Sequence, residues 1–122
     1  MTLKTEQYFD EKAFSTLLKS DDASLLYPLF ERALDSLTRF VKEPIKDYSL
    51  LEFETHTLKT TCNQLGVKRL ANVLSALEKA AAQDDANRCD ALKRLINSEF
   101  AQVEGALKSH AEELKQMAQP RS

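Results

Sequence analysis

The chain has 122 residues, of which 43% are hydrophobic and 30% charged, so its length and composition fit one soluble globular domain and not two. Its 17 Lys and Arg residues stand against 19 Asp and Glu, for a formal charge of -2. This balance argues against nucleic-acid binding through phosphate neutralisation. With only 2 Gly and 3 Pro, the chain has few turn-forming residues and is predicted to be all-α.

Apolar residues recur at helical spacing along the whole chain, and no alternating run competes as a strand. The first predicted helix is short and spans residues 10–18. The polar residues 20–22 then offer N-cap oxygens to a second helix, over residues 23–42, which Pro44 ends.

Two further helices are predicted to form a tight hairpin. Ser49 is expected to cap the third helix, which runs to Leu65, and Glu52 completes a capping-box pattern with it. Gly66 is the one plausible break after this helix, because glycine adopts the left-handed C-terminal turn without strain. The fourth helix then spans residues 67–83.

A long fifth helix is predicted over residues 88–117, with Gly105 inside it. Four long amphipathic helices joined by short links predict an antiparallel four-helix bundle. The short first helix would cap one end of this bundle. We therefore expect a single domain over residues 1–122, with its core at about residues 10–117.

The same sequence bears on location and on metal binding. No apolar run approaches the roughly 20 residues needed to cross a bilayer, and residues 1–10 lack the apolar core of a signal peptide. Cys62 and Cys89 are not spaced as a ligand pair, and the two histidines, His56 and His110, are far apart. We expect a cytoplasmic monomer with reduced thiols, no membrane anchor and no metal site.

One face of the third helix carries unusual residues. At 100° per residue His56 lies well outside the apolar stripe and faces water, with Lys59 one turn away. Phe53 is an aromatic residue that the stripe does not explain. The stripe itself consists of Leu51, Thr55, Leu58, Cys62 and Leu65.

Glu78 is predicted to approach this face from the fourth helix. It lies on the flank that an antiparallel hairpin turns toward Lys59 and His56. His56 and Glu78 stand about 15 Å and about 18 Å from the turn at Gly66. A carboxylate therefore comes within plausible reach of an exposed imidazole.

These residues carry a family resemblance, in the segments His56-Thr57-Leu58-Lys59, Leu65-Gly66, Arg69-Leu70-Ala71 and Leu77-Glu78. Together they resemble the histidine phosphotransfer (HPt) domain family of two-component phosphorelays. That family has the pattern H-x-L-K-G-S-S, a Leu-Gly pair at the end of the same helix, and Gln or Glu on the next one. The order of a short helix and four bundle helices also matches.

The resemblance implies a covalent phosphoryl carrier and not an enzyme. His56 would accept a phosphoryl group from an aspartyl phosphate on a receiver domain and pass it to another receiver. Lys59 would offset phosphate charge, and Glu78 would orient the imidazole so that Nε2 is the phosphorylated atom. The partners implied are receiver domains of response regulators or hybrid sensor kinases. The chain would need no cofactor of its own, and the receiver would bring Mg²⁺.

The chain departs from the family pattern at Thr60, where the family has glycine; Thr61 and Cys62 follow it. The branched Thr60 side chain is expected to narrow the approach of a receiver. Phe53, Thr60 and Asn63 are the predicted partner-binding residues. For Phe53 the alternative is partial burial beneath the first helix or the loop at Pro44.

Two other function classes compete with the carrier. One is a non-catalytic helical interaction module that binds a receiver or kinase without being phosphorylated. The other is an ATP-using histidine kinase fragment, for which the sequence supplies no Walker A segment and no Gly-rich loop. His110, at the edge of the last helix's stripe, is expected to be a flank histidine with its hydrogen bonds satisfied.

Overall fold

The computed structural model describes residues 9–119. Throughout this range the chain is all-helical and contains no strand, which confirms the predicted class. The helices are α2 (Ala13–Leu18), α3 (Ala23–Lys42), α4 (Tyr48–Leu65), α5 (Lys68–Ala82) and α6 (Ala86–Ala118).

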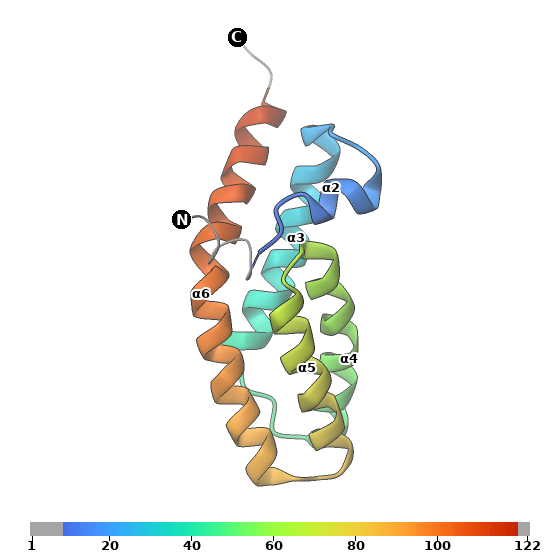
Figure 1. Ribbon diagram of the computed structural model, residues 1–122, viewed down its shortest axis with the longest axis vertical. Helices are drawn as coiled ribbons and strands as arrows, with labels where there is room; N and C mark the ends of the chain where they lie inside the picture. The colour runs from blue at the N-terminus through green and yellow to red at the C-terminus, as the bar shows by residue number, and fades with distance from the viewer. Residues whose placement is uncertain (1–8, 120–122) are drawn as a thin grey trace.

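The long helices, α3 to α6, lie along one long axis (Figure 1). α4 and α5 form a hairpin whose members pack closely side by side. α6 packs against α3 and α5, and α3 also contacts α4. The short α2 lies across the end of the hairpin and contacts α4 and α3. The outer face of α4 is therefore left uncovered beside α2.

The buried side of α4 is the predicted stripe, all five members of which are buried: Leu51, Thr55, Leu58, Cys62 and Leu65. Thr55 is fully buried, and its hydroxyl donates to the carbonyl oxygens of Leu51 at 2.8 Å and Glu52 at 2.9 Å. The polar group is thus satisfied within the helix. Because this stripe faces the core, the opposite side of α4 must face water.

The helix starts are partly as predicted. Asp22 caps α3, and its carboxylate accepts from the backbone N–H of Ser24. The predicted cap of α4 at Ser49 is wrong, because α4 begins at Tyr48, two residues before the start that a Ser49 cap implies, and is capped by Asp47. The Asp47 carboxylate accepts from the N–H of Ser49 at 2.8 Å and of Leu50 at 3.1 Å. The Ser49 N–H that a capping box would have directed to Glu52 is therefore already bound by Asp47.

The α4–α5 turn is tied to the start of the chain. Gly66 has φ 89°, the left-handed conformation expected at a helix C-terminus. Its carbonyl accepts from the backbone N–H of Asp10 at 2.8 Å. A Cβ at Gly66 would collide with the carbonyl oxygen of Asp10. This contact holds residues 10–12 out of the helix, so α2 begins at Ala13 and is shorter than predicted.

An aromatic cluster fills the core beyond the hairpin. Phe14 packs edge-on against Phe30 with ring centroids 5.5 Å apart, and Phe9 lies beside Phe30. The His110 ring lies 5.1 Å from Phe30 and 5.7 Å from Phe9. The prediction of a satisfied His110 is wrong, since its buried Nδ1 finds no hydrogen-bond partner among residues 9–119. The Glu113 carboxylate lies 3.9 Å from this nitrogen, beyond hydrogen-bond distance.

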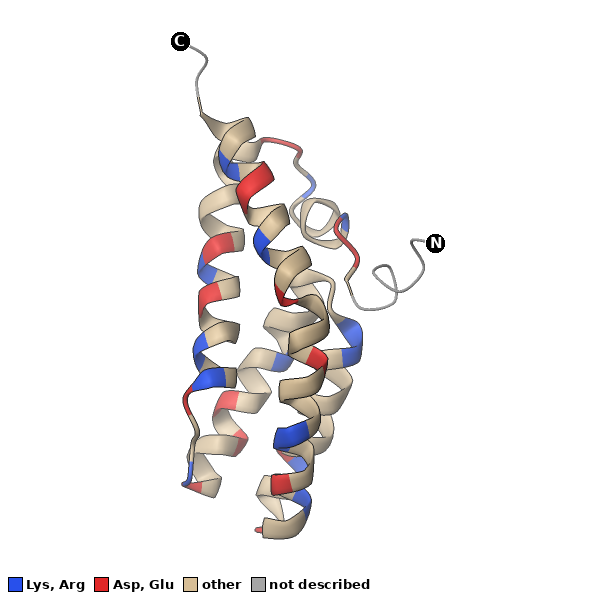
Figure 2. Cartoon of the chain, turned by 90° about the vertical axis from the view of Figure 1, so that its left-hand side faces the viewer, with Lys and Arg blue, Asp and Glu red and all other residues tan. Residues whose placement is uncertain are grey.

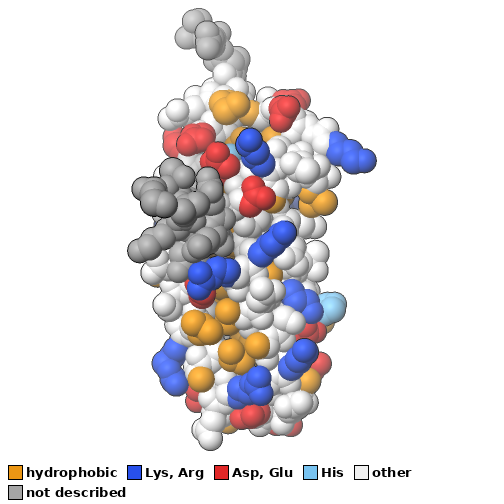
Figure 3. All heavy atoms as spheres, viewed as in Figure 1, with side chains coloured by type: hydrophobic (Ala, Val, Ile, Leu, Met, Phe, Trp, Pro, Cys, Tyr) orange, Lys and Arg blue, Asp and Glu red, His pale blue; other side chains and the backbone are white. Residues whose placement is uncertain are grey.

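The surface carries mixed charge. Lys and Arg are interspersed with Asp and Glu along the helices that face the viewer in Figure 2. On the face shown in Figure 3, hydrophobic side chains gather where α5 meets α6. Leu95 of α6 is 44% exposed. Among the described helices, none is long and apolar enough to cross a membrane.

The two glycines allow a matched test of the hairpin turn. Gly66→Ala should destabilise the fold by at least about 1 kcal/mol from the left-handed backbone alone, and the collision with Asp10 adds to this. Gly105→Ala should stabilise it by about 0.5 to 1 kcal/mol, because a Cβ there meets nothing within 4 Å. Denaturant unfolding of both variants measures the difference. Equal stabilities would contradict the role given to Gly66.

Candidate functional site

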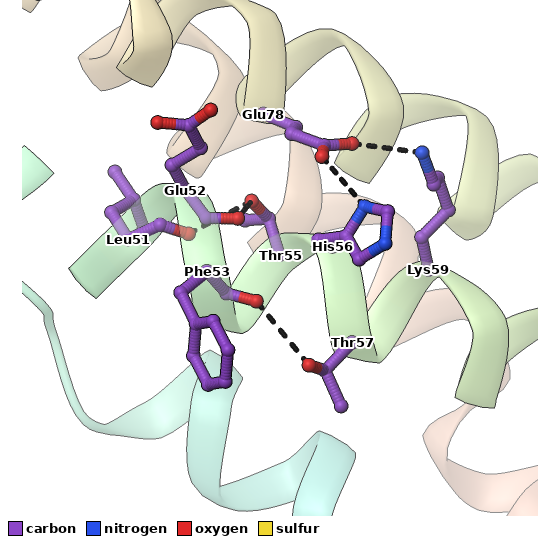
Figure 4. Close-up of polar contacts among 8 residues, drawn as sticks. All are labelled: Leu51, Glu52, Phe53, Thr55, His56, Thr57, Lys59 and Glu78. Carbon is purple, nitrogen blue, oxygen red and sulfur yellow. Dashed lines mark hydrogen bonds and ion pairs between the residues drawn. The ribbon is translucent and has the colours of Figure 1, made fainter. Parts of the chain in front are cut away.

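The outer face of α4 presents an imidazole in contact with a carboxylate from α5. The His56 side chain is 67% exposed, and its Nδ1 lies 2.8 Å from Oε2 of Glu78 (Figure 4). The two residues stand at similar heights on the antiparallel hairpin, and their rotational positions turn them toward each other. The predicted proximity of His56 and Glu78 is therefore confirmed.

Glu78 also binds a cation. Its second oxygen, Oε1, accepts from Nζ of Lys59 at 2.8 Å. Lys59 is 30% exposed and Glu78 21%, so both are more sheltered than the histidine. Figure 4 shows the carboxylate between the imidazole and the ammonium group. The three side chains form one connected group, which we call the His–Glu–Lys triad (His56, Glu78 and Lys59).

The electrostatics of the triad keep the carboxylate ionised. The hydrogen bond from Lys59 holds the pKa of the Glu78 carboxyl below its usual value. Burial opposes this shift, and the hydrogen bond with the His56 ring reinforces it. At neutral pH Glu78 is thus an anion that can only accept hydrogen bonds.

An acceptor at this position fixes the tautomer of the neutral ring. The proton must lie on Nδ1, where it is donated to Glu78, so Nε2 carries a free lone pair. Among residues 9–119, none forms a hydrogen bond with Nε2 of His56. The neutral ring therefore presents an unprotonated Nε2 to solvent. The contact of Nδ1 with Glu78 orients the ring, in the way that carboxylates orient metal-bound histidines.

Apolar side chains lie on the α3 side of the triad. Phe53 is 67% exposed and Leu50 is 49% exposed, so the alternative of a partly buried Phe53 is wrong. Leu50 lines a groove of about 450 Å³ between α3 and α4, together with Phe40, Pro44 and Ile45. Exposed aromatic and aliphatic side chains beside a groove are typical of protein docking surfaces.

Thr60 and Asn63 lie elsewhere on the same helix face. Both are exposed, one and two turns beyond His56, and both line a separate pocket between α2 and α4. The structure thus divides the predicted partner-binding residues into two groups. Phe53 lies toward α3, whereas Thr60 and Asn63 lie toward α2.

The cysteines are remote from this chemistry. Both are reduced and buried, and burial raises the pKa of the Cys62 thiol to about 12. Burial also raises the pKa of Cys89. Across the described residues, no group of three or more His, Cys, Asp or Glu side chains could hold a metal ion.

Sequence reasoning missed two features of the site. It placed Glu78 near both His56 and Lys59 but did not show that one carboxylate would bind both, because side-chain rotamers decide this. It also missed Leu50 and the groove beside it. The available signal was an apolar residue directly outside the core stripe and one turn from Phe53.

Comparison with protein-family models, with curated protein sequences and with solved structures finds no match for this chain.

The pKa of Glu78 provides a test of the triad. It should lie below 4.5 in the native protein, and Lys59→Ala should raise it toward that ordinary value. Because the native pKa is lowered, the stabilisation from the ionised carboxylate is present above the unfolded-state pKa and is lost as pH falls through the native one.

Carboxyl ¹³C NMR titration measures both midpoints. Glu104 is the matched control, since its pKa is lowered by Lys108 and Lys42 and should not respond to Lys59→Ala. An unchanged Glu78 midpoint in this variant would show that Lys59 does not bind the carboxylate in solution.

Proposed function

We propose that this chain is a phosphorelay histidine phosphotransfer protein of the cytoplasm, with α3 to α6 as its four-helix bundle and α2 as its capping helix. His56 accepts a phosphoryl group on Nε2 from an aspartyl phosphate of one receiver domain and passes it to another. The observation that carries the proposal is the Nδ1 contact with Glu78, which leaves Nε2 unprotonated and exposed.

The transfer is a displacement at phosphorus. The Nε2 lone pair forms the new N–P bond while the P–O bond to the donor aspartate breaks, and the carboxylate leaves with that electron pair. The ring becomes cationic as the bond forms, with its Nδ1 proton directed at the ionised Glu78. Glu78 therefore stabilises the positive charge that develops on the ring. The reverse step, on a second receiver, returns the phosphoryl group to an aspartate.

Lys59 supplies the positive charge of the site. Its ammonium lies one turn from His56 and offsets the charge of the arriving phosphoryl group. In the unphosphorylated protein this ammonium is bound by Glu78. The chain thus provides the nucleophile and its orientation, and the receiver provides Mg²⁺ and the aspartyl phosphate. No cofactor of its own enters the mechanism.

The partner surface follows from the same geometry. A donor whose phosphorus reaches Nε2 must cover the residues within three or four positions of His56, or about 6 Å along α4. Phe53 and Thr60 fall inside this distance on either side of His56, and Asn63 lies one turn further. These residues are the proposed partner contacts, with Leu50 added by its exposure beside the α3–α4 groove.

A non-catalytic interaction module remains the second candidate, because the exposed Phe53 and Leu50 would suit docking with or without transfer. The two are separated by incubating the chain with a phosphorylated receiver domain. A carrier acquires acid-labile, alkali-stable phosphate, whereas a module binds the receiver and remains unlabelled.

His56→Gln should abolish phosphoryl acceptance from a phosphorylated receiver. Because the side chain is solvent-facing, the free energy of unfolding of this variant should differ from that of the wild type by no more than about 0.5 kcal/mol. His110→Gln is the control, since the chain has 2 histidines, and it should keep the label. Label retained by His56→Gln, with the native helical content, would rule out His56 as the acceptor.

Lys59→Ala should slow transfer or shorten the lifetime of the phosphohistidine, because it removes the cation nearest the phosphoryl group. Lys68→Ala is a matched control: Lys68 is exposed at the start of α5, about 15 Å from Glu78 along the helix. Transfer rates in both directions and the decay rate of the label are the measurements. If both variants behave like wild type, Lys59 has no part in the chemistry.

A further inference from the structure

We propose that the pocket between α2 and α4 receives an apolar side chain of the donor receiver domain and determines which receivers transfer to His56. This inference rests on the proposed function. The pocket has a volume of about 520 Å³. Its walls are formed by Ala13, Thr16 and Leu17 of α2 and by Thr60, Asn63 and Gln64 of α4.

The position of the pocket identifies its occupant. Thr60 forms part of the wall and follows His56 by one helical turn, about 6 Å along the axis. A protein that brings phosphorus into contact with Nε2 therefore covers the mouth of the pocket at the same time. Figure 1 shows α2 beside the end of α4, where the helix turns into α5. The protein that occupies the pocket is therefore the phosphoryl donor.

The chemistry of the walls favours an uncharged side chain. Leu17 is 53% exposed and forms the apolar side, whereas the α4 side carries hydroxyl and amide groups. Among the described lining residues Asp10 alone is charged, and its carboxylate accepts from the N–H of Lys12 at 3.1 Å. Because these described residues include no cation, they do not favour phosphate. The pocket fits an apolar side chain surrounded by polar backbone.

The α2 wall is held in place before any partner arrives. Phe14 is 6% exposed and packs on Phe30, which anchors α2 in the core. The bond from Asp10 to Gly66 fixes the segment before α2 against the hairpin turn. Leu17 is therefore exposed on a short but anchored helix. A preformed wall costs little ordering entropy on binding, so its shape can discriminate among partners.

Thr60 gives the pocket its edge on the α4 side. The family resemblance places glycine at this position, which would leave that edge open. The threonine adds a branched side chain between the pocket and His56. Because Thr60 is exposed and lines the pocket, a partner docked at His56 meets its side chain directly.

The experiment compares two phosphoryl donors on the full chain. One is a panel of purified receiver domains carrying aspartyl phosphate. The other is phosphoramidate, a small donor that needs no docking surface and releases ammonia as Nε2 forms its bond to phosphorus. The variants are Leu17→Lys and Thr60→Gly. Leu95→Lys is the matched control, because Leu95 is 44% exposed on α6, which packs against α3 and α5 and against neither α2 nor α4.

We expect Leu17→Lys to lower kcat/KM by tenfold or more for the fastest receiver, mainly through KM. Phosphoramidate labelling should stay within twofold of wild type, and Leu95→Lys should match wild type with both donors. Thr60→Gly should narrow the spread of rates across the panel. Circular dichroism of each variant establishes that the helices are intact.

Unchanged receiver kinetics in both Leu17→Lys and Thr60→Gly would overturn this inference and leave the proposed function standing. Failure of wild-type His56 to be labelled by either donor would overturn both together. A change in oligomeric state on Leu17→Lys, measured by sedimentation with no effect on transfer, would show that a second copy of the chain covers the pocket and would also overturn it.

Discussion

The left-handed turn at Gly66 is the constraint on which the site depends. Two residues, Gly66 with φ 89° and Val67, join α4 to α5, so the hairpin turn is tight and the register of one helix on the other is fixed. That register brings Glu78 of α5 level with His56 and Lys59 of α4. The carbonyl of the same glycine accepts a hydrogen bond from the N–H of Asp10, and a Cβ at this position would collide with Asp10. This close contact places α2 beside α4. The triad and the pocket thus share one structural origin.

The contacts of Glu78 contribute orientation more than stability. Exposed ion pairs are typically worth about 0 to 1 kcal/mol, and His56 is largely exposed. A contact of this strength does not hold a fold together, but it is sufficient to choose between two tautomers of an imidazole. Lys59 strengthens the choice because it lowers the pKa of the carboxyl and keeps it an acceptor. The most sheltered member of the triad therefore controls the most exposed one.

The sequence predicted the features that depend on helical periodicity. It predicted few of those that depend on which side chain caps a helix or on which distant residues surround a side chain. The α4 stripe, the hairpin and the approach of Glu78 to His56 all follow from angles and rises per residue. The predicted Ser49 cap was wrong because Asp47, two residues upstream, caps the helix, and its carboxylate accepts from the N–H groups of Ser49 and Leu50. The prediction that His110 has its hydrogen bonds satisfied was wrong, because nothing in the sequence near this residue shows that Phe9 and Phe30 lie against its ring. Contacts between distant segments and side-chain rotamers lie outside what periodicity can determine.

The site separates chemistry from recognition on the two sides of one helix face. On the α5 side of His56 stand the paired charges of Glu78 and Lys59, which in the proposed transfer act on the ring and on the phosphoryl group. On the other sides lie the exposed Phe53 and the pocket beside α2, whose described lining does not include His56. Substitutions at these recognition surfaces can change which partner docks without altering the tautomer of the nucleophile. A carrier that must accept from one receiver and donate to another needs this independence, because its chemical step is the same in both directions while its partners differ.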